Sequence, residues 1–151
     1  MGGTDMKILV INGPNLNMLG IREPGIYGKN SFTDLLALLE EAGKETGTEV
    51  TQYQSNHEGD LVDRIQQAYF DGVDGIVINP AAYTHTSVAI ADAVKAVGIP
   101  TIEVHISDPD SREEFRKISY IRKASLATVA GRGFQGYIDA IEILEKSGET
   151  R

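Results

Sequence analysis

Short apolar runs of the strand type alternate with segments of helical periodicity along nearly the whole chain. Each run is brief and rich in β-branched residues, which is typical of a buried strand rather than a helix. The strands predicted in this way cover residues 7–12, 49–55, 75–79, 101–104 and, more weakly, 126–130. Strands that alternate with helices at this spacing predict an α/β fold, in which right-handed crossovers build a parallel sheet with helices on both faces.

The segments between these runs predict the helices. Ser31 and Asp34 form a capping-box-like start for a first helix, which ends before Gly47. Two further helices are expected at 87–97 and, as a short segment, at 112–118. The other apolar positions at helical spacing are Leu35, Leu38, Leu39 and Ala42, then Leu61, Ile65, Ala68 and Tyr69, and finally Tyr137, Ile138, Ile141 and Leu144. Five such units favour the flavodoxin-like, doubly wound strand order 2-1-3-4-5.

Size and charge narrow the possible functions. With 151 residues, of which 41 % are hydrophobic, the chain fits one domain over 1–151, with 1–5 expected as a flexible N-terminal extension. The net charge of −8 argues against a nucleic acid or a membrane surface as partner, because both are bound through concentrated Lys and Arg. No apolar stretch approaches the roughly 20 residues that cross a bilayer, and the start lacks a secretion signal, so we expect a cytoplasmic protein. The absence of cysteine excludes disulfides and thiolate metal sites.

Polar residues follow the three strands that would be neighbours in this order. Ligands of open parallel sheets bind beyond the carboxyl ends of the strands, where the winding direction changes. A stretch of about 18 residues without periodicity, 13–30, follows the first strand, and such long connections are usually functional or disordered. The candidate residues at the three strand ends are Asn12, Asn15, Arg22, Tyr27, Asn79, Thr84, His85, His105, Ser107, Arg112 and Arg116. We therefore expect amide, imidazole, phenol and guanidinium groups to converge on one crevice.

Each of these groups also has an ordinary structural explanation. Asn12 and Asn15 beside a Gly-Pro pair are common turn residues, and Thr84 and Ser87 could cap a helix. His105 alone could be a strand-end histidine with its hydrogen bonds satisfied, and the charged residues of 112–117 could be a solvated, salt-bridged helix face. These explanations weaken when all the groups fall at one end of the sheet.

Two patterns suggest cofactors but carry little weight. The segment 131–136 has the glycines of a phosphate loop, yet it follows the fifth strand and lacks the Lys-Ser/Thr pair, which favours close packing and the start of a helix. Three histidines can hold zinc, but those of this chain lack a close-spaced ligand motif: His57, His85 and His105. We therefore expect neither a metal nor a phosphate-bearing cofactor.

Four stretches together resemble one enzyme family. They are GPNLNMLGIREPGIYG, INPAAYTHTS, IEVHISDPDSREEFR and GFQGY. From Met6 to about Leu144 the chain resembles the type II 3-dehydroquinate dehydratases. The resemblance implies a flavodoxin-like fold and a hydro-lyase that converts 3-dehydroquinate to 3-dehydroshikimate and water without any cofactor, in aromatic amino acid biosynthesis or quinate catabolism. It also implies a homododecamer, arranged as a tetramer of trimers.

The resemblance assigns a role to each matching residue. Tyr27 would remove a proton next to the ketone, with Arg22 beside it. His105 would be the general acid that protonates the departing hydroxyl, Glu103 would orient it, and Asn15 would hold a water against the enolate. The implied substrate contacts are Asn79, His85 and Arg116 for hydroxyls, the backbone of Ile106 and Ser107 for the carboxylate, the loop residue Arg112, and Asp92, which would reach a neighbouring subunit's site.

The base assignment makes physical sense only with cations nearby. A phenol has a pKa of about 10, so a half-ionised Tyr27 at neutral pH needs a drop of about 3 units, or roughly 4 kcal/mol. One guanidinium typically lowers a neighbouring acid by about 1 to 3 units. Arg22 could therefore supply most of the drop, and Arg112 could add the remainder when a loop closes.

One position departs from the family pattern. Ala81 stands where the family usually has a glycine after Asn-Pro. If that position needs a positive φ or a close approach to the ligand, alanine would cost on the order of 1 kcal/mol, and we expect weaker activity rather than a changed reaction.

The rival interpretations are a flavin- or phosphoryl-binding module, which would need an acidic cluster where Asn-Gly-Pro-Asn stands, and a structural oligomer in which Asp92 makes subunit contacts.

Overall fold

The computed structural model describes residues 5–21 and 30–149. Within these residues a parallel sheet has the order β2-β1-β3-β4-β5, as the alternating pattern predicts. Its strands are β1 (Lys7–Asn12), β2 (Glu49–Gln54), β3 (Gly75–Asn79), β4 (Thr101–His105) and β5 (Ala127–Ala130). The fourth strand is one residue longer than predicted, so that His105 is its last residue.

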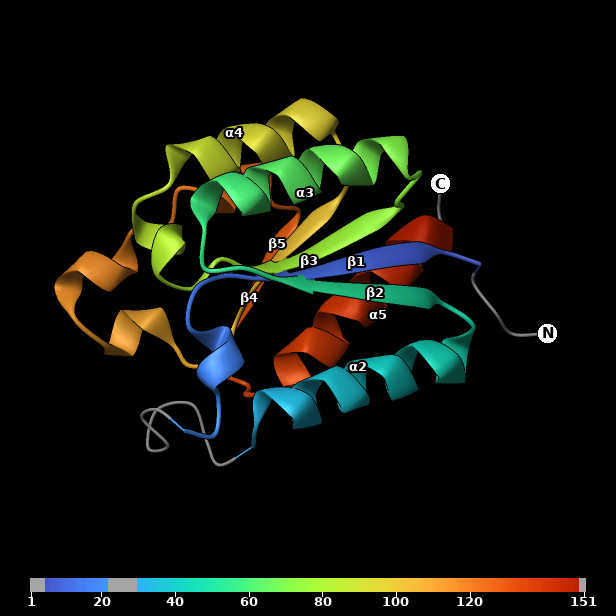
Figure 1. Cartoon of the computed structure of the whole chain (residues 1–151), viewed down its shortest axis with the longest axis horizontal. Coiled ribbons are helices and arrows are strands. Elements are labelled where there is room, and N and C mark those ends of the chain that lie inside the picture. The colour runs from blue at the N-terminus through green and yellow to red at the C-terminus, as the bar shows by residue number, and fades with distance from the viewer. Residues whose placement is uncertain (1–4, 22–29, 150–151) are drawn as a thin grey trace.

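Helices cover both faces of the sheet (Figure 1). The helices α3 (Glu58–Phe70) and α4 (Val88–Val97) lie on one face, and α2 (Phe32–Thr46) and α5 (Gln135–Glu149) lie on the other. Short 3-10 helices occur in the connections: η1 (Leu16–Met18), η2 (Ala81–His85), η3 (Pro109–Ser111), η4 (Glu114–Lys117) and η5 (Arg122–Ala124). Within the described ranges, no helix has the length and apolar character to span a membrane.

Cap residues fix where the helices begin and end. Ser31 and Asp34 form a complete capping box at the start of α2, as predicted. The hydroxyl of Ser87 accepts the backbone N–H of Ile90 and caps α4, so the ordinary explanation for this serine is correct. Gly47 and Gly98 end α2 and α4 in the left-handed conformation.

Two details of the helices differ from the predictions. The segment 112–118 is not one helix, because the backbone is extended at Arg112 and Glu113 and only Glu114–Lys117 form a 3-10 turn. Tyr69 is 61 % exposed and packs edge-on against Phe70 instead of lying on the inner face of α3. Each helical residue advances the side chain by about 100°, so Tyr69 has turned away from the face that Ala68 ends. Leu38 is likewise exposed at 38 %.

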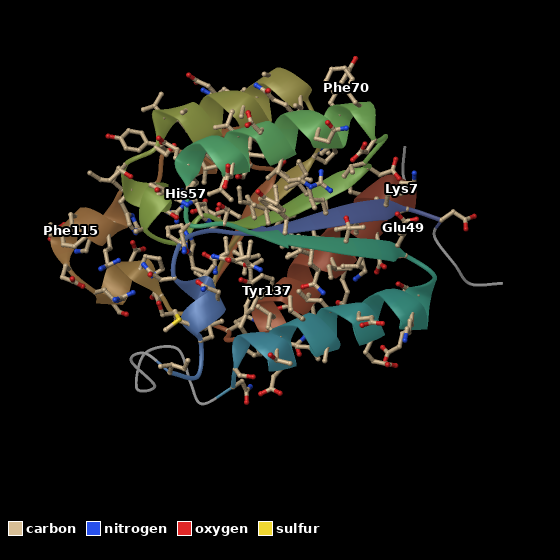
Figure 2. All side chains as sticks on the ribbon, in the orientation of Figure 1. Lys7, Glu49, His57, Phe70, Phe115 and Tyr137 are labelled. Atoms are coloured by element: carbon tan, nitrogen blue, oxygen red, sulfur yellow. The ribbon has the colours of Figure 1, made fainter. Side chains whose placement is uncertain are left out.

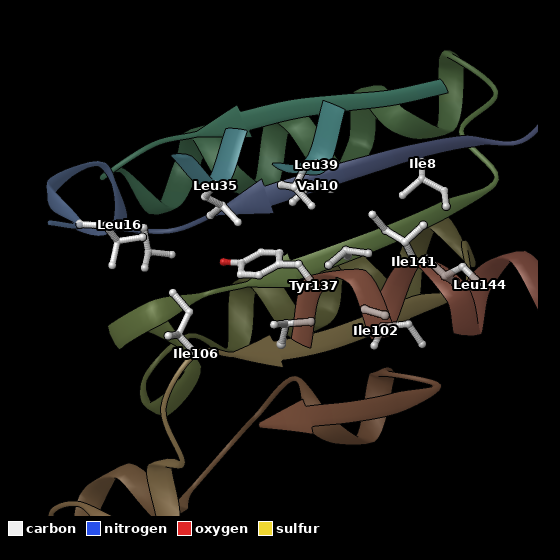
Figure 3. Close-up of a cluster of buried hydrophobic side chains, with 14 of the residues drawn as sticks. Ile8, Val10, Leu16, Leu35, Leu39, Ile102, Ile106, Tyr137, Ile141 and Leu144 are labelled. Carbon is white, nitrogen blue, oxygen red and sulfur yellow. The ribbon is translucent and has the colours of Figure 1, made fainter. Parts of the chain in front are cut away.

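The core consists of one buried cluster on each face of the sheet. Leu9, Ile11, Ile76 and Ile78 point toward α3 and α4, and the alternate residues of the same strands point toward α2 and α5. Figure 3 shows the second cluster, with Tyr137 of α5 at its centre and the tyrosine hydroxyl directed toward the end of the sheet where Leu16 and Ile106 lie. The Tyr137 ring thus packs within the apolar cluster and places its hydroxyl at the carboxyl ends of the strands.

The two ends of the sheet differ in character. Lys7 and Glu49 lie side by side at the amino ends of β1 and β2, and His57 lies near the opposite, carboxyl end (Figure 2). At that carboxyl end, Gly13 packs so closely on Pro80 that a Cβ would lie 2.4 Å from the proline carbonyl oxygen. The loops that follow β1 and β3 are therefore in direct contact, and a side chain at Gly13 would force them apart.

Candidate active site

A cavity of about 140 Å³ opens at the carboxyl end of the sheet. It lies between the segments that follow β1, β3 and β4, which is where the strand order predicts a ligand site. The predicted site residues that line it are Asn15, Asn79, His85, His105, Ile106, Ser107, Arg112 and Arg116. The structure thus brings together residues as far apart in the chain as Asn15 and Arg116.

The remaining predicted residues lie elsewhere or outside the described ranges. Asn12 and Thr84 are buried and do not line the cavity. Glu103 is completely buried behind His105. Asp92 is exposed on α4 and does not line the cavity. Arg22 and Tyr27 lie outside the described residues.

Glu103 and His105 form a buried carboxylate–imidazole pair. They are two residues apart on β4, so both side chains project from the same face of the strand. Nε2 of His105 lies 2.5 Å from Oε2 of Glu103. Because an ionised carboxylate only accepts hydrogen bonds, Nε2 carries a proton and the ring is held in one orientation.

Three further side chains, none of them among the predicted site residues, donate to Glu103. The hydroxyls of Ser119 and Thr128 lie 2.8 and 3.0 Å from its two oxygens, and Nε of Arg122 lies 3.5 Å away. Thr128 is the direct partner of Glu103 in the pairing of β4 with β5, so strand register could have revealed it. No local pattern marks Ser119 or Arg122.

These donors keep Glu103 ionised despite its burial. Burial alone raises the pKa of a carboxyl group, but the hydrogen bonds from His105 and Ser119 and the charges of His105 and Arg122 outweigh it, so the pKa of Glu103 lies below its usual value. The imidazole of His105 therefore has a fixed negative group on one side and the cavity on the other. Such an imidazole can give or take a proton at Nδ1 while Nε2 stays bonded.

His85 is positioned as a neutral imidazole. Its Nδ1 lies 2.7 Å from the backbone oxygen of Ile118, and a carbonyl can only accept, so Nδ1 carries the proton. Burial, together with the charges of His105 and Arg116, lowers the pKa of His85 below its usual value even though the bond to Ile118 opposes this. Nε2 of His85 is consequently a hydrogen-bond acceptor at neutral pH.

Two arginines make the cavity locally positive. The side chains of Arg112 and Arg116 are 15 % and 22 % exposed and both line the cavity. Nε of Arg116 bonds to the exposed Glu113 at 3.0 Å and its guanidinium lies 4.9 Å from the ring centre of Phe115. The local arrangement thus offsets the negative charge of the whole chain and suits an anionic ligand.

The loop after β1 is held in an unusual backbone conformation. Asn15 has a φ of 71°, and its backbone N–H donates to Oδ1 of Asn56 at 3.0 Å. Gln54 supports the same loop by donating to the backbone oxygen of Gly13 at 3.1 Å. Asn15 is therefore more than a free turn residue, because the side chain of Asn56, just after β2, fixes its backbone beside the cavity, and Gln54 at the end of β2 holds the neighbouring Gly13.

Ala81 also has positive φ, at 54°. Its backbone N–H donates to Oδ1 of Asn79 at 3.1 Å, which closes a turn around Pro80. The premise about this position is therefore correct: a glycine would adopt the conformation without the strain that alanine suffers.

The glycine-rich segment before α5 serves packing. The backbone N–H groups of Gly131 and Gly133 donate to carbonyls of the chain just after β4, at His105, Ser107 and Ile106. Gly136 faces Val104 and Val129, where a Cβ would make contacts of 3.6 and 3.4 Å. Among the described residues, no group of three His, Cys, Asp or Glu side chains is arranged to hold a metal ion.

Comparison with known proteins identifies the family. The sequence profile described as Dehydroquinase class II matches residues 6–145. The chain is 54 % identical over 140 residues to a 3-dehydroquinate dehydratase of Clostridium beijerinckii, with 93 % of this chain and 96 % of the relative covered. The crystal structure of a type II dehydroquinase from Butyrivibrio crossotus superposes with a TM-score of 0.92 at 55 % identity, covering 94 % of this chain and 99 % of that one. A type II dehydroquinase from Propionibacterium acnes gives 0.90 at 44 % identity, covering 95 % and 99 %. The chain therefore belongs to the class II dehydroquinase family.

Proposed function

We propose that this protein is a hydro-lyase that converts 3-dehydroquinate to 3-dehydroshikimate and water. The observation that supports this most strongly is the His105 imidazole, held at the cavity by the ionised Glu103. Removal of water needs a proton donor at the departing hydroxyl, and an oriented imidazole at this point of the cavity suits that task. Arg112 and Arg116, which follow β4 and line the same cavity, suit the negative charge of the substrate and of an enolate.

The proposed reaction has two proton transfers. Tyr27, with Arg22 beside it to favour the phenolate, takes a proton from the carbon next to the ketone, and the electron pair of that C–H bond forms an enolate. Asn15 holds a water against the enolate oxygen. The enolate then re-forms the ketone, its electrons form the new C=C bond, and the C–O bond breaks as His105 gives its Nδ1 proton to the leaving hydroxyl. The products are the conjugated enone and one water.

The peptide geometry after β4 supports the proposed carboxylate contacts. The carbonyls of His105 and Ile106 accept hydrogen bonds from the backbone of Gly131 and Gly133 at 3.2 and 3.0 Å. In a trans peptide the N–H points opposite to the carbonyl, so the N–H groups of Ile106 and Ser107 point away from those glycines. Both residues line the cavity, which makes their amides suitable donors to a substrate carboxylate.

We assign the substrate hydroxyls to three further residues that line the cavity. His85 offers the unprotonated Nε2 to a hydroxyl hydrogen, and Arg116 and Asn79 offer donors to hydroxyl oxygens. Arg112 adds positive charge near the reacting face. A site with both kinds of partner would favour a polyhydroxylated ring over a simple keto acid.

We also propose a homododecamer built as a tetramer of trimers, working in the cytoplasm as a metabolic enzyme. The exposed Asp92 on α4 would reach the active site of a neighbouring subunit in this assembly. Exposed apolar side chains near the cavity segments, Phe115, Ile118 and Tyr120, would be covered by subunit contacts. Light scattering of the purified protein tests the subunit number.

The test of the proposed function is the ultraviolet absorbance of the enone, followed after mixing the protein with 3-dehydroquinate. Tyr27→Phe should abolish turnover and leave the affinity for an unreactive substrate analogue within about threefold, because only the reacting proton loses its acceptor. Tyr69→Phe, which changes an exposed tyrosine on α3, is the control and should keep full activity. Turnover by folded Tyr27→Phe would refute the base assignment, and absence of any enone with the unaltered protein would refute the function.

A further inference from the structure

Three polar side chains of the core meet behind the cavity. Asn12 and Asn79 are the last residues of β1 and β3 and are direct partners in the pairing of these strands. Tyr137 of α5 is fully buried and its hydroxyl reaches both of them, 2.5 Å from Oδ1 of Asn12 and 3.0 Å from Nδ2 of Asn79. Of the three, only Asn79 lines the cavity.

One backbone group fixes the direction of the hydrogen bonds that join Asn79, Tyr137 and Asn12. The N–H of Ala81 can only donate, so the atom of Asn79 that it contacts is the carbonyl Oδ1 and the other is the amide nitrogen. The Asn79 nitrogen donates to the Tyr137 oxygen, which leaves the tyrosine hydrogen for Oδ1 of Asn12. The donors thus run in one direction, from Asn79 to Tyr137 to Oδ1 of Asn12, and the buried Asn12 amide nitrogen beyond them has no hydrogen-bond partner among the described residues.

The direction of these hydrogen bonds determines which atom of the Asn79 amide is left for a ligand in the cavity. One N–H of the Asn79 amide is used by Tyr137 and the carbonyl is used by Ala81, so the second N–H of Nδ2 is the donor left for a ligand. A rotated amide would turn its oxygen toward the Tyr137 oxygen and its nitrogen toward the Ala81 N–H, and would place two donors face to face. The amide is therefore held in one polarity.

We infer that Tyr137, together with Asn12, is a positioning residue of the active site that fixes the Asn79 amide with an N–H group presented to an oxygen acceptor of the substrate. This inference rests on the proposed role of Asn79 in substrate binding. The apolar cluster around the Tyr137 ring would accept a phenylalanine in the same place, so a tyrosine is needed only for the hydroxyl. The hydrogen bonds to Asn12 and Asn79 offset the desolvation free energy of burying that hydroxyl.

The experiment is a double-mutant cycle with Tyr137→Phe and Asn79→Ala, measured as kcat and KM for 3-dehydroquinate. Each single variant should raise KM by about 3- to 10-fold, the equivalent of one hydrogen bond, and leave kcat within about twofold. If Tyr137 acts through Asn79, adding Tyr137→Phe to Asn79→Ala should produce no further rise in KM. Asn12→Ala, which removes the acceptor of the tyrosine hydrogen, should shift KM in the same direction and provides a second test if Tyr137→Phe folds poorly.

The control separates positioning from stability. Thr48→Val removes a buried hydroxyl that bonds to Glu145 at 2.6 Å, far from the cavity at the amino end of β2. It should lower the unfolding midpoint by an amount similar to Tyr137→Phe without changing KM. KM effects of Tyr137→Phe and Asn79→Ala that multiply in the double variant would overturn the inference. An unchanged KM in Asn79→Ala would instead refute the role of Asn79 in binding, while activity of the unaltered protein would leave the proposed reaction intact.

Discussion

Glu103→Gln tests whether the buried charge behind His105 is needed for catalysis. The substitution keeps the shape of the side chain but replaces one acceptor oxygen with an N–H₂ donor. If the new amide N–H₂ faces Nε2 of His105, the imidazole must move its proton to the other nitrogen. If the N–H₂ instead faces Thr128 and Arg122, it is placed against the N–H donor of Arg122. Either outcome removes the fixed negative partner of the imidazole. We expect kcat/KM to fall by between about 10² and 10⁴.

The effect on stability follows from the contacts of Glu103. It accepts hydrogen bonds of 2.5, 2.8 and 3.0 Å from His105, Ser119 and Thr128. A bond to an ionised acceptor contributes about 1 kcal/mol more than a neutral one, which gives a loss of about 3 kcal/mol over three bonds. A neutral amide is cheaper to bury than a carboxylate, so we expect a net destabilisation of about 1 to 2 kcal/mol. The partly exposed Arg122 adds little.

The assay combines enone absorbance with urea unfolding at pH 7 and in acid. The pKa of Glu103 is lower in the folded protein than the usual 4.5, so the stabilisation from its charge is complete above pH 4.5 and is lost as the pH falls below it. Glu103→Gln should therefore lose less stability between pH 7 and strong acid than the unaltered protein. Glu114→Gln, which changes an 86 % exposed carboxylate, is the matched control and should alter neither property. A folded Glu103→Gln variant with kcat/KM within about threefold of the unaltered protein would show that the reasoning is wrong.

Two further predictions concern the segment after β3. Ala81→Gly should stabilise the fold by about 0.5 to 1 kcal/mol in urea unfolding, because relief of the positive φ exceeds the added chain entropy; Ala82→Gly, in the same 3-10 helix but without positive φ, should destabilise it. The pKa of His85 lies below its usual 6.5, so KM should stay constant from pH 8 to 6.5 and rise only in more acidic solution, as protonation removes the Nε2 acceptor. A His85→Gln variant lacks this acid rise if the assignment is correct, and KM that already rises above pH 6.5 would contradict it.

The sheet could be predicted because its signal is local and strong. Strands such as 7–12 and 75–79 are buried on both faces, so they form continuous apolar runs between turn residues. The buried faces of the helices were harder to predict near the helix ends. Tyr69 fits the apolar spacing of α3 but lies one residue beyond its buried face. The segment 112–118 has helical charge spacing but its backbone is extended at Arg112 and Glu113, and the side chain pattern does not carry that information.

The site could be predicted in part, for a similar reason. Residues at strand ends, such as Asn79 and His105, are brought together by the strand order alone, and the cavity confirms their convergence. The groups that hold them are set by tertiary contacts between distant segments. Tyr137 lies 125 residues from Asn12 and has the spacing of an ordinary core residue of α5, so its role in the hydrogen-bond chain could not be inferred from local pattern. Ser119 reaches Glu103 only because the segment after η4 returns to β4.

The negative side chain of the site is buried and its positive side chains line the cavity, an arrangement that would suit an anion even on an acidic chain. Glu103 is completely buried behind His105, whereas Arg112 and Arg116 line the cavity itself. A small anion in the cavity would therefore meet guanidinium and imidazole groups, because the described residues that line it include no carboxylate. The net charge of −8 acts from farther away and is screened beyond about 10 Å at 0.1 M salt. A long polyanion would extend past the arginines onto the acidic surface, so the same distribution of charge favours a compact anionic ring and disfavours nucleic acid.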